Sequence, residues 1–338
     1  MTDTVERIQL GHGSGGKLTH DLIQQLFAPR LANPILEPLG DAGLVELEQV
    51  GLAMTTDSFV VSPLFFPGGD IGSLAVNGTV NDLAVAGARP RFLSLGAILE
   101  EGLPIETLVR VVDSLAAAAR RAQVQIVTGD TKVVERGKGD GIFLNTAGLG
   151  LQRPGYPRQD RRSRPEDLLL VSGPLGDHGA VVLAARSGIE LSGELCSDCA
   201  PVTPLVDALF DAGVVPLFMR DPTRGGLAGV ACDVAEQLAL GLRLDEAEIP
   251  VRPDVTTLCE LVGVDPLHLA CEGRVVALVA AQDAPAALAA WRRLDQGREA
   301  RAIGRLLSDH PGLVTLNTRF GGTRRVVRPT AELLPRIC

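Results

Sequence analysis

The order of strand-like and helix-like segments is the feature that most restricts how this chain can fold. Short apolar runs at 52–56, 92–98, 124–127 and 142–149 predict strands. A helix is predicted at 72–87, and an apolar-periodic helix at 103–122. The same mixture returns further along, with strands predicted at 168–172 and 275–281 and helices at 179–187, 204–212, 226–238 and 284–293. Two such runs predict an α/β (α+β) chain built in two halves.

A segment rich in proline, arginine and glycine separates the two halves. It reads LQRPGYPRQDRRSRPED from residue 151 and is typical of a linker. The last stretch combines two prolines with little periodicity, which predicts a mobile tail. We therefore expect an N-terminal domain at 1–152, a C-terminal domain at 153–327, and a tail at 328–338 that ends in Cys338.

Charge and hydropathy exclude several classes of function. The net charge is −9 and the arginine groups are short and scattered, which argues against nucleic-acid binding. The start, MTDTVERIQL, lacks the basic and apolar regions of a secretory signal. No uncharged apolar run approaches the roughly 20 residues of a membrane span. We therefore expect a cytoplasmic protein without membrane contact.

The six cysteines are not densely spaced, which is typical of reduced thiols in a cytosolic protein. Cys196 and Cys199 form one C-x2-C pair. A structural zinc site needs a second pair, and Cys232, Cys259 and Cys271 do not supply one at the required spacing. Small buried thiols are therefore favoured over zinc.

The glycine loop GHGSGGK at 11–17 matches two nucleotide-binding patterns incompletely. A P-loop requires Ser or Thr after the lysine, where this chain has Leu18, and Glu37 lacks the strand context of a dinucleotide fold. The loop keeps the property that both patterns share: glycines let backbone N–H groups approach a phosphate closely. The alternative is a flexible N-terminal loop. The candidate phosphate ligands are Gly11, Gly13, Gly15, Gly16 and Lys17.

Four aspartates are candidate metal ligands: Asp41, Asp57, Asp82 and Asp130. Asp57 and Asp130 follow apolar runs, where strands are expected to end and where α/β sheets bind ligands. Together the four predict a Mg²⁺–nucleotide site, because Mg²⁺ prefers carboxylate and phosphate oxygens. Singly, each aspartate has an alternative as a turn former or helix cap.

Two further motifs suit phosphate. Lys132 follows Asp130 by two residues, on the same face of a strand, and a lysine there can neutralise phosphate charge. DPTRGGLAG places Asp221, Thr223 and Arg224 before a predicted helix whose free N–H groups can bind an anion. The alternative is a Pro–Gly turn with a helix cap. His178 either lines the site or caps a turn.

Seven motifs, in this order, resemble those of the HypE family, the carbamoyl dehydratases of nickel–iron hydrogenase maturation. They are GHGSGGK, TTDSFVVSPLFFPGGDIG, VNGTVNDLAVAGA, VTGDTKVVERG, SGPLGDHGA, DPTRGGLA and the terminal PRIC. The resemblance implies a two-domain PurM-like fold, as in aminoimidazole ribonucleotide synthetase. It also implies a homodimer whose N-terminal domains pair into a barrel, with ATP near the interface.

By this resemblance, the carbamoyltransferase HypF carbamoylates Cys338, and the enzyme uses ATP to dehydrate the product to a thiocyanate. The cyano group passes to a HypC–HypD complex as an iron ligand. The four aspartates would hold Mg²⁺ and ATP, Lys132 and Arg224 would contact phosphate, and Glu272 would be the base. The family commonly has Asn where this chain has Cys271.

Two alternatives remain at this point. One is another ATP-dependent small-molecule synthetase or kinase of the same superfamily, which has no use for Cys338. The other is a non-enzymatic metal or thiol chaperone that uses Cys196, Cys199 and Cys338.

Overall fold

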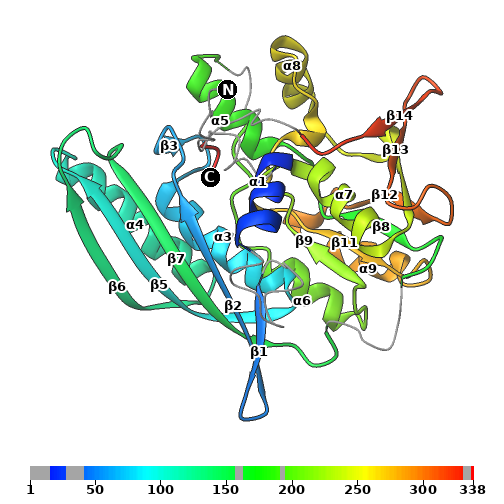
Figure 1. The fold of residues 1–338 in the computed structure, drawn as a ribbon, viewed down its shortest axis with the longest axis horizontal. Helices are drawn as coiled ribbons and strands as arrows, with labels where there is room; N and C mark the ends of the chain where they lie inside the picture. The colour runs from blue at the N-terminus through cyan, green and yellow to red at the C-terminus, as the bar shows by residue number, and fades with distance from the viewer. Residues whose placement is uncertain (1–15, 28–41, 157–162, 191–194, 330–335) are drawn as a thin grey trace, which may run out of the picture.

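Two sheets with their helices form two domains that lie side by side (Figure 1). The computed structural model describes residues 16–27, 42–156, 163–190, 195–329 and 336–338. The predicted two-domain α/β architecture is confirmed. No helix in these ranges is both long and apolar enough to cross a membrane.

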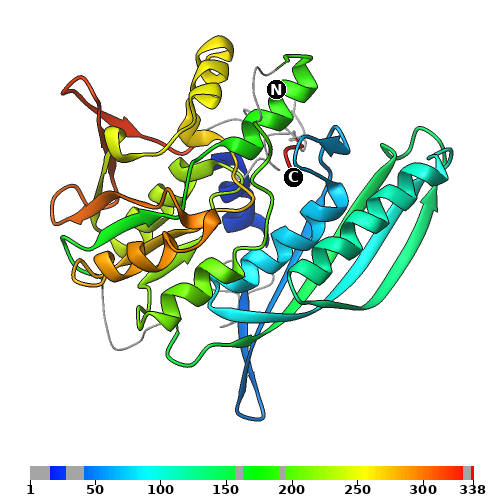
Figure 2. The ribbon, with the colours of Figure 1, turned by 180° about the vertical axis from the view of Figure 1, so that it is seen from behind.

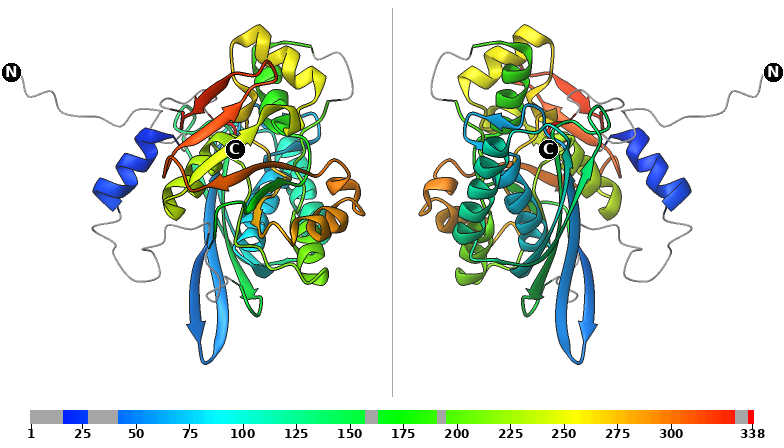
Figure 3. Two further views of the ribbon diagram at one scale, coloured as in Figure 1. Left: turned by 90° about the vertical axis from the view of Figure 1, so that its right-hand side faces the viewer. Right: turned by 90° about the vertical axis from the view of Figure 1, so that its left-hand side faces the viewer.

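The N-terminal sheet has five strands in the order β1-β2-β7-β5-β6. Its strands are β1 (Gly43–Leu47), β2 (Val50–Phe59), β5 (Ala88–Glu100), β6 (Gln125–Val134) and β7 (Ile142–Gln152). β5 and β6 are parallel because helix α4 (Ile105–Arg121) connects them, whereas the other pairs are antiparallel. The β1–β2 hairpin projects beyond the body of the protein (Figure 3).

Helices α3 (Ile71–Val85) and α4 cover one face of this sheet (Figure 2). α3 is buried along almost its whole length, because the sheet lies on one side of it and the C-terminal domain on the other. The helix begins at Asp70, whose carboxylate accepts hydrogen bonds from Gly72 N and Ser73 N. At Gly78 an added Cβ would lie 3.0 Å from the Phe59 ring, so glycine permits the close approach of helix and sheet.

The other face of the N-terminal sheet carries exposed apolar side chains. Met54, Phe92, Ile98 and Leu151 are 57%, 41%, 46% and 40% exposed. β6 is one of the two edge strands and is exposed along nearly its whole length. A sheet face of this kind is typical of a surface that packs against another molecule.

The C-terminal sheet has seven strands in the order β14-β13-β10-β12-β8-β11-β9. They are β8 (Leu168–Val171), β9 (Phe218–Arg220), β10 (Gly241–Asp245), β11 (Val276–Val279), β12 (Arg301–Leu307), β13 (Val314–Asn317) and β14 (Thr323–Val326). Helix α7 (Gly226–Leu238) packs on one face, and α6 (Thr203–Asp211) and α9 (Ala284–Trp291) on the other. Leu169 and Leu170 of β8 face these two separate cores, as period-two alternation requires.

The remaining described elements lie at the junction of the domains or at its edge. They are α5 (Asp177–Ser187), α8 (Pro253–Val262), the short pair β3 (Phe65–Phe66) and β4 (Gly69–Asp70), and α1 (Lys17–Leu22) with a π-helical turn at Ile23–Phe27. α5 and α8 share one apolar core with α3 and α4. Figure 3 shows α1 outside the body of the two domains.

Two predicted strand ends are wrong. Asp57 lies inside β2 and pairs with Thr146, and Asp130 lies inside β6 and pairs with Gly96. Both strands continue past their apolar runs because a neighbouring strand still supplies hydrogen-bond partners. Strands β1, β9, β10 and β12–β14 and helix α8 were not predicted, because these short segments carry weak or mixed hydrophobic patterns.

Candidate active site

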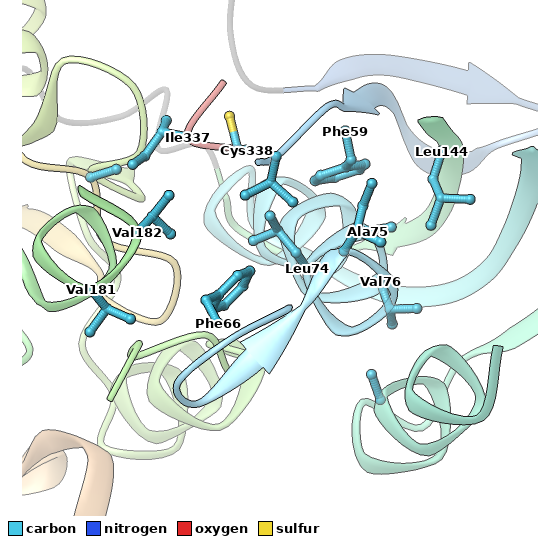
Figure 4. Packing of buried hydrophobic residues seen from close by; sticks show 14 of the residues in the cluster. Phe59, Phe66, Leu74, Ala75, Val76, Leu144, Val181, Val182, Ile337 and Cys338 are labelled. Atoms are coloured by element: carbon cyan, nitrogen blue, oxygen red, sulfur yellow. The ribbon is translucent and has the colours of Figure 1, made fainter. Parts of the chain in front are cut away.

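The last residues of the chain lie buried between the two domains. Ile337 and Cys338 are 5% and 9% exposed and belong to the core shared by α3 and α5. Val60 N donates to Cys338 O at 3.0 Å, and Ser62 N donates to Arg336 O at 3.2 Å. Figure 4 shows Ile337 beside Val182 of α5, with the sulfur of Cys338 pointing away from Leu74. The sequence predicts a mobile tail, and in the structure the end of this tail is docked.

Asp57 and Asp82 flank this junction from the N-terminal domain. Asp82, on α3, accepts a hydrogen bond from Thr55 Oγ1 at 3.0 Å. Asp57, on β2, lies 3.9 Å from Arg224 Nη2 of the C-terminal domain. Burial raises the pKa of Asp57, although Arg224 and the N–H of Ser58 oppose the shift. A second cation would therefore stabilise this carboxylate further.

Arg224 precedes α7 and lies where several predicted site residues meet. The negative charge at Cys338 is the largest cause that raises the pKa of Arg224, and Asp57, Glu272 and Asp82 add to it. Its side chain is 43% exposed, so it remains accessible to a ligand. The structure thus brings together residues from both domains and from the last position of the chain.

The turn that carries Arg224 has the backbone that the DPTRGG motif predicts. Thr223 N donates to Asp221 O at 3.0 Å, and Gly226 N donates to Thr223 O at 2.9 Å. Gly225 and Gly226 have φ of 83° and 57°, a region that favours glycine. Asp221 is buried at the base of the turn.

Glu272 is a buried carboxyl group in the loop before β11. Its backbone N donates to Asp198 Oδ1 at 3.1 Å, and its carbonyl accepts from Asn81 Nδ2 of α3 at 2.9 Å. The side chain is 1% exposed, and its Oε1 atom has no hydrogen-bond partner among the described residues. Burial raises the pKa of Glu272 well above 4.5, and nearby carboxylates, with Asp221 first, raise it further, while Arg224 lowers it. Glu272 therefore has the environment of a general base.

Asp130 and Lys132 do not join this cluster within one chain. Their side chains form an ion pair at 2.6 Å and are 70% and 69% exposed. β6 lies three strands from β2, about 14 Å away at the usual strand spacing. Asp57 pairs with Thr146, whose side chain contacts α3 on one face of the sheet. Asp130 is aligned, through Gly96 of β5, with Asn145 of β7, whose side chain lies on the opposite face. Within one chain, Asp130 is therefore not brought together with Asp57 and Asp82.

Gly11, Gly13, Gly15 and Asp41 lie outside the described residues. Lys17 begins α1 directly after Gly16, and Lys17 N donates to Pro329 O at 3.1 Å. Lys17 lines a pocket together with residues of α7 and β14, and the predicted acids do not contribute to that pocket. Across the described ranges, no three His, Cys, Asp or Glu side chains are grouped closely enough to hold a metal ion.

The C-x2-C cysteines are not arranged as metal ligands. Cys196 is exposed, whereas Cys199 Sγ accepts from Asn77 Nδ2 at 3.3 Å. Burial raises the pKa of Cys199 to about 12, so this thiol stays protonated. Cys271 is buried, and its sulfur accepts from Gly176 N at 3.1 Å. The prediction of small buried thiols is confirmed for Cys271 and is wrong for Cys196, which is exposed, while Cys199 is partly buried.

Comparison with known proteins identifies the family. Models of the AIR synthase related protein match residues 39–152 as its N-terminal domain and 164–316 as its C-terminal domain. The carbamoyl dehydratase HypE of Azotobacter vinelandii is 48% identical over 98% of this chain and 97% of its own length. The chain belongs to the HypE family of carbamoyl dehydratases. The resemblance carried by the seven motifs is thereby confirmed, as is the activity of the family in hydrogenase maturation.

Solved HypE structures share the fold described above. A HypE–HypF complex matches with a TM-score of 0.85 and 43% identity, covering 91% of this chain and 99% of that chain. A HypE structure in complex with ATP has a TM-score of 0.82 and 45% identity, covering 98% and 100%.

Several residues at the junction between the two domains were not predicted as site residues from the sequence. His178, whose role was left open, contacts the carbonyl of Ile337, and Arg186 of the same helix contacts that of Arg336. Asn81 connects α3 to the loop of Glu272. The signal for His178 was its place in SGPLGDHGA, but a motif does not show which backbone atom a side chain contacts.

Proposed function

We propose that this chain dehydrates its own carbamoylated C-terminus. The substrate is the S–C(=O)–NH₂ group on Cys338, and the products are S-cyanocysteine, ADP and phosphate. One observation carries the proposal: the last residue of the chain is buried between two domains, with its charge acting on Arg224. The docking of Cys338 at the junction that also holds Arg224 and Glu272 points to a reacting group.

The amide oxygen is a poor leaving group, and phosphorylation makes it a good one. The carbamoyl oxygen attacks the γ-phosphorus of ATP, a C–O–P bond forms and ADP leaves. Arg224 stabilises the charge on the transferring oxygens. Glu272 takes one proton from the nitrogen, the second passes to the departing phosphate, and the C≡N bond forms. The raised pKa of Glu272 suits a base that works near neutral pH.

Mg²⁺ fits the oxygen donors on the N-terminal side of the junction. Asp57 is partly buried, with Arg224 Nη2 at 3.9 Å, and Asp82 lies on the adjacent helix α3. We assign Mg²⁺ to Asp57 and Asp82, with Asp41 as a further candidate, and phosphate oxygens would complete its shell. The ion would neutralise charge between ATP and these carboxylates. Gly11, Gly13, Gly15, Gly16 and Lys17 remain candidate phosphate ligands.

A homodimer explains the open face of the N-terminal sheet. Pairing of two such sheets into a barrel would cover Met54, Phe92 and Ile98 and would place β6 at the interface. Asp130 and Lys132 lie far from Asp57 within one chain. We therefore propose that they act on the nucleotide bound by the partner subunit.

The tail serves two reactions in turn. A HypE relative has been solved with HypF, so we propose that a HypF-type carbamoyltransferase modifies Cys338 and that a HypC–HypD complex accepts the cyano group. Ten residues from Pro329 to Cys338 reach at most ~33–36 Å when extended. This reach allows the thiol to leave the junction for a partner and return.

Intact-mass spectrometry tests the proposal. The protein is carbamoylated by HypF and then given Mg²⁺ and ATP. We expect the mass of one carbamoyl group to appear and then to fall by one water. Cys338→Ala should take up no carbamoyl group but should bind ATP as the native protein does. Transfer of the group to another residue in that variant would contradict the carrier role.

A further inference from the structure

Both domains hold the docked tail through hydrogen bonds to its main-chain carbonyl groups. On the N-terminal side, Val60 N and Ser62 N donate to the carbonyls of Cys338 and Arg336. On the C-terminal side, His178 Nε2 lies 2.8 Å from Ile337 O, and Arg186 Nη2 lies 2.8 Å from Arg336 O. Contacts to these carbonyl groups hold the backbone of the tail in position.

His178 is the fully buried member of this set. A carbonyl oxygen can only accept, so Nε2 of His178 carries the hydrogen and donates to Ile337 O. Nδ1 is then an acceptor and takes the hydroxyl hydrogen of Ser197, whose Oγ lies 2.8 Å away. The same Oγ accepts from Cys199 N at 3.1 Å. This chain of hydrogen bonds fixes one tautomer of the ring.

The surroundings of His178 keep the ring neutral and in one orientation. Burial lowers its pKa, and Phe66 packs edge-on with ring centroids 5.2 Å apart. The ring belongs to α5, the helix that also presents Arg186. One helix of the C-terminal domain therefore contacts the carbonyl groups of two consecutive tail residues.

We propose that His178 is a positioning residue that latches the C-terminal tail in the junction through its Nε2–H. Latching favours the dehydration step, which needs the modified Cys338 beside Arg224 and Glu272. It opposes carbamoylation, which needs the thiol outside. The two reactions rest on the proposed function, whereas the docking equilibrium does not.

If His178 holds the tail in this way, its loss should change the rates of carbamoylation and dehydration in opposite directions. Loss of one buried hydrogen bond shifts a local equilibrium by roughly 3- to 10-fold. His178→Ala should therefore raise the rate of carbamoylation by HypF and lower the dehydration rate, and the ratio of the two rates should change by that factor. General damage to the fold would lower both rates.

Alkylation of Cys338 by iodoacetamide tests the latch independently of either reaction. The rate follows the fraction of time in which the tail is open, because Cys338 is 9% exposed when docked. We expect His178→Ala to raise the rate at Cys338 roughly 3- to 10-fold. His178→Gln, which keeps an N–H donor, should restore part of the protection. His310→Asn, at an exposed histidine with φ of 56°, is the matched control.

Two other cysteines of the chain serve as internal references for the alkylation rate. Exposed Cys196 should react at the same rate in every variant, and buried Cys259 should stay protected. Unchanged protection of Cys338 in His178→Ala would overturn the proposal, as would an equal fall of both reaction rates. If that variant exposes Cys259, His178→Phe replaces it, because phenylalanine keeps a buried ring beside Phe66 but has no N–H to donate to Ile337 O. Native-like protection of Cys338 in His178→Phe would then overturn the latch.

Discussion

Arg224 Nη2 lies 3.9 Å from Asp57 Oδ1, and this contact joins the C-terminal domain to the N-terminal sheet. Neither residue belongs to the core of its own domain. Their charges meet at the place where the last residue of the chain is docked, since the charge at Cys338 also acts on Arg224. The junction is therefore an electrostatic site as well as a packing surface.

Replacement of Arg224 should slow dehydration without unfolding the protein. Arg224→Ala removes a cation from the transferring phosphate, and we expect a rate loss on the order of 10²–10³. Arg224→Lys should recover part of that loss because it restores the charge but not the planar fork. Single-turnover loss of water from carbamoylated protein measures the effect. Arg298→Lys, at a 76% exposed side chain, is the control, and equal rates for Arg224→Ala and this control would refute the role.

Glu272→Gln should abolish dehydration and yet stabilise the fold at neutral pH. Because the pKa of Glu272 is raised well above 4.5 in the folded state, the folded protein binds more protons than the unfolded one above that pH. The free energy of unfolding therefore falls as pH rises through this window, and Gln, which resembles the protonated acid, does not share the loss. Thermal melts at pH 4 and pH 8 measure it. At pH 8 the melting temperature of the variant should exceed that of the native protein by about 2–4 °C for each kcal/mol of added stability, and at pH 4 it should change little. A higher melting temperature at pH 4 alone would contradict the argument.

Subunit complementation tests where Lys132 acts. Lys132→Ala and Cys338→Ala homodimers should each be inactive in dehydration. In a mixed dimer, the native Lys132 of one subunit meets the native Cys338 of the other at one site. If Lys132 acts across the interface, random mixing should restore roughly a quarter of the native activity. If it acts within its own chain, mixing restores none, and the proposed arrangement fails.

A charge on the open sheet face should prevent dimerisation. Phe92→Asp places a carboxylate on the apolar face of the N-terminal sheet, where burial against a second sheet would cost several kcal/mol. Light scattering after size exclusion should then report a monomer. Ile105→Asp, at a 74% exposed apolar residue that begins α4, is the matched control and should stay dimeric. A dimeric Phe92→Asp protein would show that another surface mediates association.

Strongly periodic segments were predictable because their partners are implied by their own pattern. α4 and β7 were recognised from local periodicity, and they pack into the core that the pattern requires. β10 and β12–β14 were missed because their stability depends on neighbours that are distant in sequence. The ends of β2 and β6 were misplaced for the same reason, since the ladder continues through Asp57 and Asp130.

The sequence alone determined the family, the two α/β units and the set of chemical groups, because motif order and residue type are local properties. The tertiary structure decided which groups meet. It brought Cys338 close enough for its charge to act on Arg224, raised the pKa of Glu272 by burial and by nearby carboxylates, and set Lys132 on a distant sheet edge. It also gave His178 a carbonyl to hold. Burial and charge act through space, so their effects on a pKa or a docked tail appear only when both domains are in place.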